Sequence, residues 1–231
     1  MSETWLIYNY KIESFFKMDK KTQSKVKIIE KTFEAIKRDD KGFANISLLR
    51  VAEELSMPYE ELTSFFLTIE DIYLNEQERN NRKVEKYLES GLSEVKTAND
   101  AKSLFENTIR MFVMDLPDYA DVVWAATPFL PKCLEERNRM KVYLRKTFKK
   151  IIKKGWPGKI ETVLDRQTDL CILSFYGLYE YCARAKKKDR KAILEDFINM
   201  LNLHLQDRYS FNFSFKFHLL EQGWLYLGIL S

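Results

Sequence analysis

The amino-acid sequence predicts an all-α protein, and three observations lead to this expectation. Only 7 glycines and 5 prolines occur among 231 residues, which together make about 5% of the chain, whereas their average usage is about 12%. Because Gly and Pro mark turns, few turns are expected between long elements. Apolar residues recur at steps of three and four, which is the period of one helix face. The apolar content of 45% and the aromatic content of 14% supply a sizeable core and argue against extensive disorder. These features disfavour a β-sandwich, a barrel and an enzyme with a glycine-rich nucleotide loop.

Four helices are expected in the first 90 residues, and each has a recognisable boundary. Gly42 is the expected C-terminal cap of the first helix, and Ser47 is suited to cap the second. Pro58 is well tolerated in the first turn of the third helix. Thr68 and Asp71 form the capping-box pattern at the start of the fourth. We expect these helices over residues 22–37, 48–55, 59–66 and 68–90.

The rest of the chain continues as helices that end at Gly and Pro. Gly91 follows the fourth helix, Pro117 ends the next one, and Pro128 and Pro131 close a short helix. The segment Gly155-Trp156-Pro157-Gly158 is the clearest break in the chain. We expect helices over residues 99–114, 118–129, 132–154, 159–185 and 189–205.

The helix over residues 159–185 is apolar around most of its circumference, so it must be covered on two sides. In a chain of this size the second cover is often another subunit. We therefore expect a homodimer through residues 159–185 and 189–205. The apolar residues that lead to this expectation are Leu164, Cys171, Ile172, Phe175, Leu178, Tyr179 and Cys182.

The two ends of the chain differ from the helical middle. In the tail, residues 208–231, aromatic residues alternate with polar ones from Tyr209 to His218, which is a strand pattern. This aromatic tail could pack on the body, pair across a dimer or form an appendage, and the sequence does not decide among these. Met18 would itself serve as a protein start, so residues 1–17 read as an extension.

Residues 48–66 have the pattern of a helix-turn-helix. Two short helices flank a tight break at Ser56-Met57-Pro58. Ala52 is small enough to let the helices cross closely, and Leu62 and Phe66 point inward. The second helix of such a unit enters the major groove of DNA.

The segment 25–73 resembles the DNA-binding domain of the tetracycline-repressor (TetR) family of bacterial regulators. The match is gapless over residues 46–73, although the first helix has two extra residues between Phe33 and Gly42. The matching positions are Ile46-Ser47, Val51-Ala52-Glu53, Leu62, Phe66, Thr68, Glu70 and Ile72. The resemblance implies a three-helix head, a long linking helix and a helical body that binds an effector and dimerises.

The head departs from the family in its charge. No Lys or Arg occurs between Ala52 and Ile69, although phosphate neutralisation by these residues supplies much of DNA affinity. Glu60-Glu61 stands where the family has Gly-Thr, and Ile69 where it has Lys. Basic residues that could compensate are Lys17, Lys20, Lys21, Lys25, Lys27, Lys31 and Arg50. The residues expected to face DNA are Lys25, Ser47, Arg50, Tyr59, Glu60, Thr63 and Ser64.

The body carries two further candidate features. From Arg137 to Lys159 there are ten basic residues and no acid, which fits nucleic acid, an acidic partner, a membrane surface or simply a solvated helix face. Aromatic and Met side chains of the body fit either ordinary core packing or the wall of an apolar cavity. The residues expected to bind a small apolar effector are Met111, Met114, Trp124, Phe129, Phe175, Tyr176 and Tyr179.

Catalytic and metal chemistry has little support. Cys133, Cys171 and Cys182 read as reduced core thiols of a cytoplasmic protein, and His204 and His218 lack metal-ligand spacing. No catalytic motif is present, so we expect no enzyme, no metal and no cofactor. The N-terminus has no signal-peptide pattern, and no apolar run reaches 18 residues.

The sequence therefore predicts a helix-turn-helix head over residues 22–68, a helical effector-binding and dimerisation domain over 69–207, and the aromatic tail. The expected function, from the resemblance, is a dimeric TetR-like regulator that binds operator DNA and responds to a small apolar effector. The alternative is a TetR-fold ligand- or lipid-binding protein with weakened or lost DNA binding.

Overall fold

The computed structural model describes residues 20–38 and 46–205, and every regular element in these two ranges is helical, as the sequence predicts. The aromatic tail, residues 1–17 and the expected cap Gly42 lie outside the described residues. The helices are α2 (Lys20–Arg38), α3 (Leu48–Glu54), α4 (Tyr59–Phe65), α5 (Ile69–Glu94), α6 (Ala98–Met114), α7 (Ala120–Ala126), the 3₁₀ turn η2 (Thr127–Phe129), α8 (Pro131–Gly155), α9 (Glu161–Arg184) and α10 (Lys187–Leu205).

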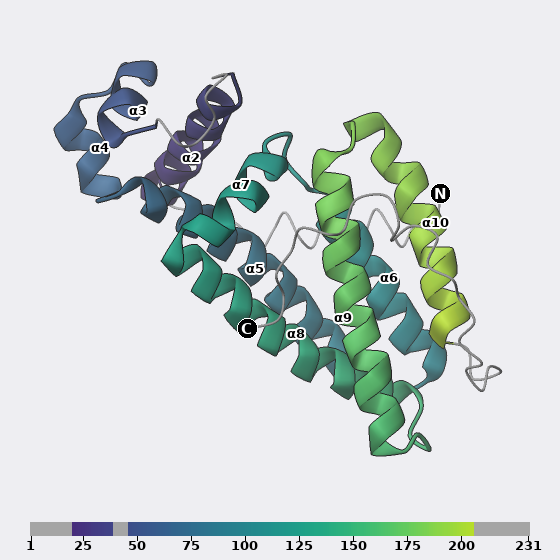
Figure 1. The fold of residues 1–231 in the computed structure, drawn as a ribbon. Helices are drawn as coiled ribbons and strands as arrows, with labels where there is room; N and C mark the ends of the chain where they lie inside the picture. The colour runs from purple at the N-terminus through teal and green to yellow at the C-terminus, as the bar shows by residue number, and fades with distance from the viewer. Residues whose placement is uncertain (1–19, 39–45, 206–231) are drawn as a thin grey trace.

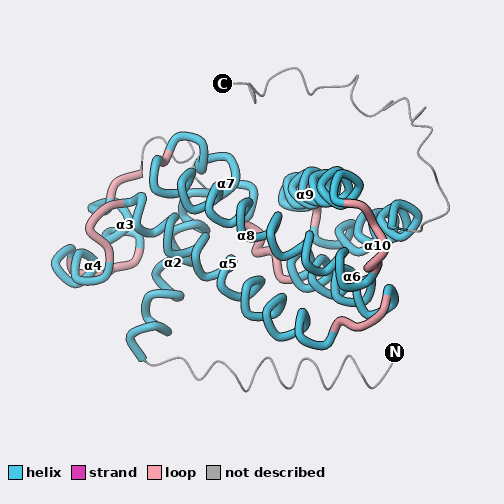
Figure 2. Tube along the Cα trace, turned by 90° about the horizontal axis from the view of Figure 1, so that it is seen from below, coloured by secondary structure: helices cyan, strands magenta, loops and turns pink. Residues whose placement is uncertain are grey.

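The helices form a small group at one end of a longer bundle (Figures 1 and 2). Helices α2, α3 and α4 lie together, and α5 runs from them along the whole body. Helix α8 packs against α5, α6 and α9, and α10 packs against α6 and α9. At 1.5 Å per residue, the 26 residues of α5 span about 39 Å. The far end of the body is therefore well separated from α4.

Local sequence signals set several helix starts. The Ser47 hydroxyl accepts a hydrogen bond from the Arg50 N–H at the start of α3. Thr68 and Asp71 form a capping box at the start of α5, as expected from their spacing. Thr97 and Asp100 form a second capping box at the start of α6. Each cap satisfies backbone N–H groups that have no partner within the helix.

Two expected boundaries differ from the structure. Gly91 does not end a helix, because α5 continues through it to Glu94. A Cβ on Gly91 would collide with the side chain of Leu104, so this glycine permits the close approach of α6 to α5. The helix expected over 118–129 is shorter, and its last turn is the 3₁₀ turn η2. Pro128 has no N–H to continue an α-helix.

Two apolar cores lie along the molecule. The larger one fills the body between α5, α6, α8, α9 and α10. The smaller one joins the inner faces of α2, α3 and α4 to the first turns of α5. It also includes Tyr119, Val123 and Ala126 from around α7, and Cys133 from α8. The group α2–α4 therefore shares its core with three elements of the body.

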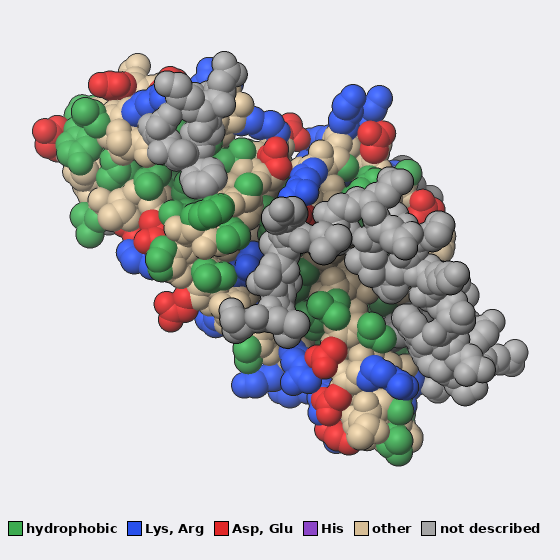
Figure 3. All heavy atoms as spheres, viewed as in Figure 1, with side chains coloured by type: hydrophobic (Ala, Val, Ile, Leu, Met, Phe, Trp, Pro, Cys, Tyr) green, Lys and Arg blue, Asp and Glu red, His purple; other side chains and the backbone are tan. Residues whose placement is uncertain are grey.

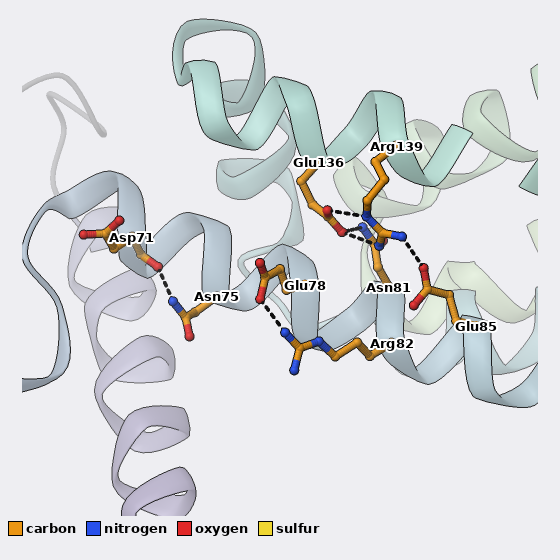
Figure 4. Close-up of polar contacts among 8 residues, drawn as sticks. All are labelled: Asp71, Asn75, Glu78, Asn81, Arg82, Glu85, Glu136 and Arg139. Carbon is orange, nitrogen blue, oxygen red and sulfur yellow. Dashed lines mark hydrogen bonds and ion pairs between the residues drawn. The ribbon is translucent and has the colours of Figure 1, made fainter. Parts of the chain in front are cut away.

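A polar cluster joins α5 to α8 halfway along the body (Figure 4). The Asn81 amide donates to Glu136 Oε1 over 2.8 Å, and both side chains are buried. Arg139 donates to both Glu136 oxygens, over 2.6 and 2.7 Å, and to Glu85 over 2.6 Å. Because a buried carboxylate requires partners, this cluster fixes the register of the two long helices.

Candidate nucleic-acid interface

Helices α3 and α4 pack against each other over a small apolar contact. Val51 and Ala52 of α3 and Leu62 of α4 are buried, and so is Phe66, the C-cap residue of α4. Ser56 turns the chain between the helices with a φ of 50°, in the left-handed region that few residues other than glycine adopt. The inner faces are thus anchored, and the outer face of α4 is left to solvent.

The outer face of α4 is acidic and carries one aromatic ring. Tyr59 is 43% exposed, and Glu60, Glu61 and Ser64 are exposed beside it. Thr63 is half-buried. The hydroxyls of Thr63 and Ser64 donate to the carbonyls of Glu60 and Glu61, over 3.1 and 2.7 Å. Their oxygens remain able to accept hydrogen bonds from a partner.

The acidic residues have a local structural role. Glu60 and Glu61 lie in the first turn of α4, where negative charge interacts favourably with the N-terminal end of the helix dipole. Helix α4 has seven residues and no side-chain N-cap, since Pro58 stands at that position. The two carboxylates therefore favour helix formation at a position where they weaken attraction to phosphates.

The other predicted contact residues lie around α4. Ser47 is exposed at the start of α3, and Arg50 is half-buried one turn further along. The Lys25 Nζ lies 5.5 Å from the centroid of the Phe66 ring, so α2 brings a positive charge to the end of α4. Six of the seven predicted residues thus lie in α2, α3 and α4, and the seventh, Ser47, is the N-cap residue of α3.

The sequence did not reveal how this group is attached to the body. Phe33 of α2 stacks on Tyr119, and it meets Tyr73 of α5 edge to face with centroids 4.7 Å apart. Lys37 donates to the Asp118 carbonyl and lies 3.6 Å from Asp121. These residues are far apart in sequence, and no motif marks them. The joint is aromatic and buried, with a polar rim.

A buried carboxylate lies behind the joint. Glu76 is fully buried and accepts two 3.0 Å hydrogen bonds from Arg79. It also accepts from the Tyr119 hydroxyl over 3.3 Å and from Asn80 over 3.0 Å. Burial, together with the charge of Glu76, raises the pKa of Tyr119 above its usual value. The phenol therefore stays protonated and keeps donating to Glu76.

The predicted effector residues separate into two groups. Trp124, Tyr176, Tyr179 and Phe175 lie in one aromatic cluster, which Phe112 of α6 completes. Phe112 lies 4.8 Å from Phe175 and 4.9 Å from Tyr179, and Trp124 lies 4.9 Å from Tyr179, between ring centroids. Phe112 was missing from the predicted set.

The other predicted effector residues lie at the edge of this cluster or outside it. Met111 is at the edge, where it lines a small cavity with Phe112 and Tyr179. Met114 is 46% exposed and Phe129 71% exposed, so neither lines an enclosed cavity. Met114 is the last residue of α6, and Phe129 is the last residue of η2.

The aromatic rings fill most of the space in which a ligand cavity was expected. The cavity at their edge has a volume of about 20 Å³ and is also lined by Asn80, Lys83 and Asp115. That volume holds about one water molecule, whereas pockets that bind drug-sized ligands have volumes of about 300 Å³ or more. An effector at this position would have to displace side chains of the cluster.

Helix α9 is covered mainly by its own chain. The apolar residues that predicted a second subunit are buried or half-buried against α6, α7, α8 and α10. Leu173 and Tyr181 remain 62% and 64% exposed. Gly177 lies between them in helical register, and nothing stands within 4 Å of a Cβ placed there. This open face of α9 is the part of the expected dimer contact that packing among residues 20–38 and 46–205 leaves uncovered.

Within the described ranges, no helix is long and apolar enough to span a bilayer, and no group of three or more His, Cys, Asp or Glu residues is arranged to hold a metal ion. The three cysteines are buried thiols, and burial raises the pKa of Cys133 to about 12 and that of Cys182 to about 11. They are therefore weak nucleophiles at neutral pH.

Comparison of the sequence with protein-family models and with curated proteins finds no match.

Proposed function

We propose that the chain is a TetR-like transcriptional regulator whose α3–α4 pair is a helix-turn-helix. The observation that supports this most is the way α4 is presented. Its inner residues Leu62 and Phe66 are fixed in the core, while Tyr59, Glu60 and Ser64 lie exposed along the opposite side. A short helix held in this way at the end of an elongated body has the geometry that enters a major groove.

The chemistry of α4 suits base contacts better than phosphate contacts. A glutamate accepts a hydrogen bond from cytosine N4, and hydroxyl side chains bond to several bases. Positive charge comes from the neighbouring α2, where Lys27 and Lys31 are exposed and Lys25 reaches the end of α4. The proposed head thus reads bases with α4 and contacts phosphates through α2 and Arg50.

A dimer and an effector complete this proposal. Two copies joined through the open face of α9 and through α10 would present two heads to two half-sites. A small apolar effector would enter the aromatic cluster around Phe112 and Tyr179 by displacing its rings. It would then shift the separation of the heads and change affinity for the paired half-sites.

One observation favours a second function. The lack of Lys and Arg from Ala52 to Ile69 removes the usual source of DNA affinity at the recognition helix. A protein of the same fold that binds an apolar ligand or lipid and has lost its operator would share this feature. The two functions differ in one testable property: the regulator binds DNA through α4, and the ligand- or lipid-binding protein does not.

The test is a salt titration of binding to duplex DNA by the wild type and by two variants, each of which has one serine changed to glutamate. Ser64→Glu adds a negative charge to the exposed side of α4, and Ser103→Glu makes the same change at an exposed position of α6. The proposal predicts binding that weakens steeply with salt and that falls at least tenfold in S64E but stays unchanged in S103E. Equal binding by both variants would overturn DNA binding through α4, and no binding by the wild type at low salt would support the alternative.

A further inference from the structure

Ion pairs and other contacts occupy much of the basic segment of α8. Arg139, Arg145 and Lys149 pair with carboxylates of α5, α8 and α9. Arg137 lies over the Trp124 ring, 5.4 Å from its centroid. These residues join α8 to its neighbours and add little attraction for a partner.

Three other lysines of α8 have no such role. Lys146, Lys150 and Lys153 are exposed, and no carboxylate of the described ranges pairs with them. Their spacing of four and three residues places them on one side of the helix. We call these three residues the lysine stripe. Lys and Arg side chains gather over this end of α8, next to acidic side chains at the start of α9 (Figure 3).

The lysine stripe borders an open groove between the ends of α5 and α8. The groove has a volume of about 560 Å³, and Lys154 forms part of its wall by donating to the Leu92 carbonyl over 2.8 Å. Lysine residues are the main charged groups of this surface, with one acidic residue among those that line the groove. The groove is lined by Glu89, Leu92, Ser93, Lys150, Lys153 and Lys154.

This surface fits a phosphate backbone better than a bilayer. The large apolar side chains between Lys146 and Lys154 are Phe148, Ile151 and Ile152, and all three are buried in the core. Nothing apolar on this stretch of α8 is therefore available to enter a membrane, as interfacial helices require. Lys146 and Lys153 are about 10 Å apart along the helix axis, and over that axial length a duplex carries about six phosphates, about three on each strand.

We propose that the lysine stripe is a second DNA contact, which binds the phosphate backbone without reading sequence. It lies at the end of α5 and α8 away from α4, so it holds a different stretch of duplex from the one that α4 contacts. The contact does not depend on the proposed role of α4, because the two surfaces share no residue.

The experiment measures binding to labelled random-sequence duplex DNA in the full-length protein, with S64E as the background that blocks α4. One variant carries Lys146→Gln, Lys150→Gln and Lys153→Gln. The matched control carries Lys186→Gln, Lys187→Gln and Lys188→Gln, which removes the same charge from exposed positions immediately before and in the first turn of α10. Exposed lysines exchanged for glutamine leave the helices intact, and circular dichroism verifies this.

The proposal predicts salt-dependent binding in the S64E background and in the control. Loss of the lysine stripe flattens the slope of log affinity against log salt by up to about 3 and weakens binding by at least about tenfold at low salt. Equal slopes for the stripe variant and the control would overturn the proposal. The proposal would also be overturned if the stripe variant lost binding to phosphatidylserine vesicles while its DNA binding stayed unchanged, because the stripe would then bind a lipid surface. Failure of α4 to bind DNA would leave the comparison of stripe variant and control unaffected.

Discussion

Phe33 of α2 stacks on Tyr119, the residue that precedes α7, with ring centroids 4.9 Å apart and planes inclined by 20°. The contact joins residues 86 positions apart in the chain. It places the inner face of the three-helix group against the body, and the Tyr119 hydroxyl donates a hydrogen bond to the buried Glu76. The stability of the proposed head is therefore tied to α7.

We expect Phe33→Ala to lower the free energy of unfolding by about 3–5 kcal/mol, because the ring is fully buried and its removal leaves a cavity. Urea denaturation followed by circular dichroism measures the change. The control is Phe129→Ala, whose ring is largely exposed, with an expected change of about 0.5 kcal/mol or less. Equal effects of the two substitutions would show that the joint contributes little.

The cluster of Glu136, Arg139 and Asn81 predicts a pH-dependent stability. Burial alone raises the pKa of Glu136, but hydrogen bonds from Arg139 and Asn81 outweigh it and hold the pKa below its usual value. A lowered pKa in the folded state stabilises the protein above the unfolded pKa of about 4.3. This contribution is lost as the pH falls through the folded pKa.

Glu136→Gln tests this contribution, because glutamine imitates the protonated acid. We expect a loss of about 1–3 kcal/mol near pH 7, and a difference from the wild type that shrinks steadily below pH 4. Urea unfolding from pH 7 to pH 3 measures it. Glu78→Gln removes the exposed pair with Arg82 and should cost about 1 kcal/mol or less. A difference that stays constant with pH would argue against the ionised carboxylate as the cause.

The acidic turn of α4 predicts a gain of DNA affinity on neutralisation. In the double variant Glu60→Gln, Glu61→Gln, repulsion of phosphates is lost, so we expect binding to random duplex DNA to strengthen several-fold at low salt. The same change should destabilise α4 slightly, by about 0.3–1 kcal/mol for each charge.

The matched control changes Asp189 and Asp196 to Asn, two exposed acids of α10. It alters the net charge equally at a distance from α4. Fluorescence anisotropy at several salt concentrations compares the two. An equal gain of DNA affinity in both variants would show that net charge alone causes the effect, and it would argue against a DNA contact through α4.

The open face of α9 predicts the dimer contact. Leu173→Asp places a charge on the exposed stretch between Leu173 and Tyr181, and a buried unpaired charge is costly. We expect sedimentation velocity at micromolar concentration to show a dimer for the wild type and a monomer for this variant. Ile160→Asp, at a similarly exposed position before α9, should remain dimeric. A monomeric wild type would rule out the proposed symmetric arrangement of the two heads.

Sequence periodicity and caps predicted the helices well because these signals are local. Ser47 and Thr68 mark helix starts by hydrogen bonds that span only three residues. The joint at Phe33 and Tyr119 could not be predicted in this way, since its partners meet only in the folded chain. The ring packing of Phe112 and Tyr179 is likewise tertiary, so a row of aromatic residues could not distinguish a filled core from a cavity.

The charge of α8 illustrates the same limit. The segment from Arg137 to Lys159 contains ten basic residues. The sequence alone does not show which of them form ion pairs with carboxylates. The positions of Asp165 and Asp169 on the adjacent α9 decide this for Arg145 and Lys149. The lysine stripe is distinguished from the other basic residues of α8 only by these tertiary pairs.

Selection of bound fragments from a pool of random duplexes tests the central claim, DNA reading by α4, most directly. We expect the wild type to enrich two inverted half-sites separated by about one helical turn or a multiple of it. S103E and the lysine-stripe variant should enrich the same sites, whereas S64E should lose them. A pool that shows no enrichment with the wild type, or that S64E enriches for the same sites, would contradict the claim.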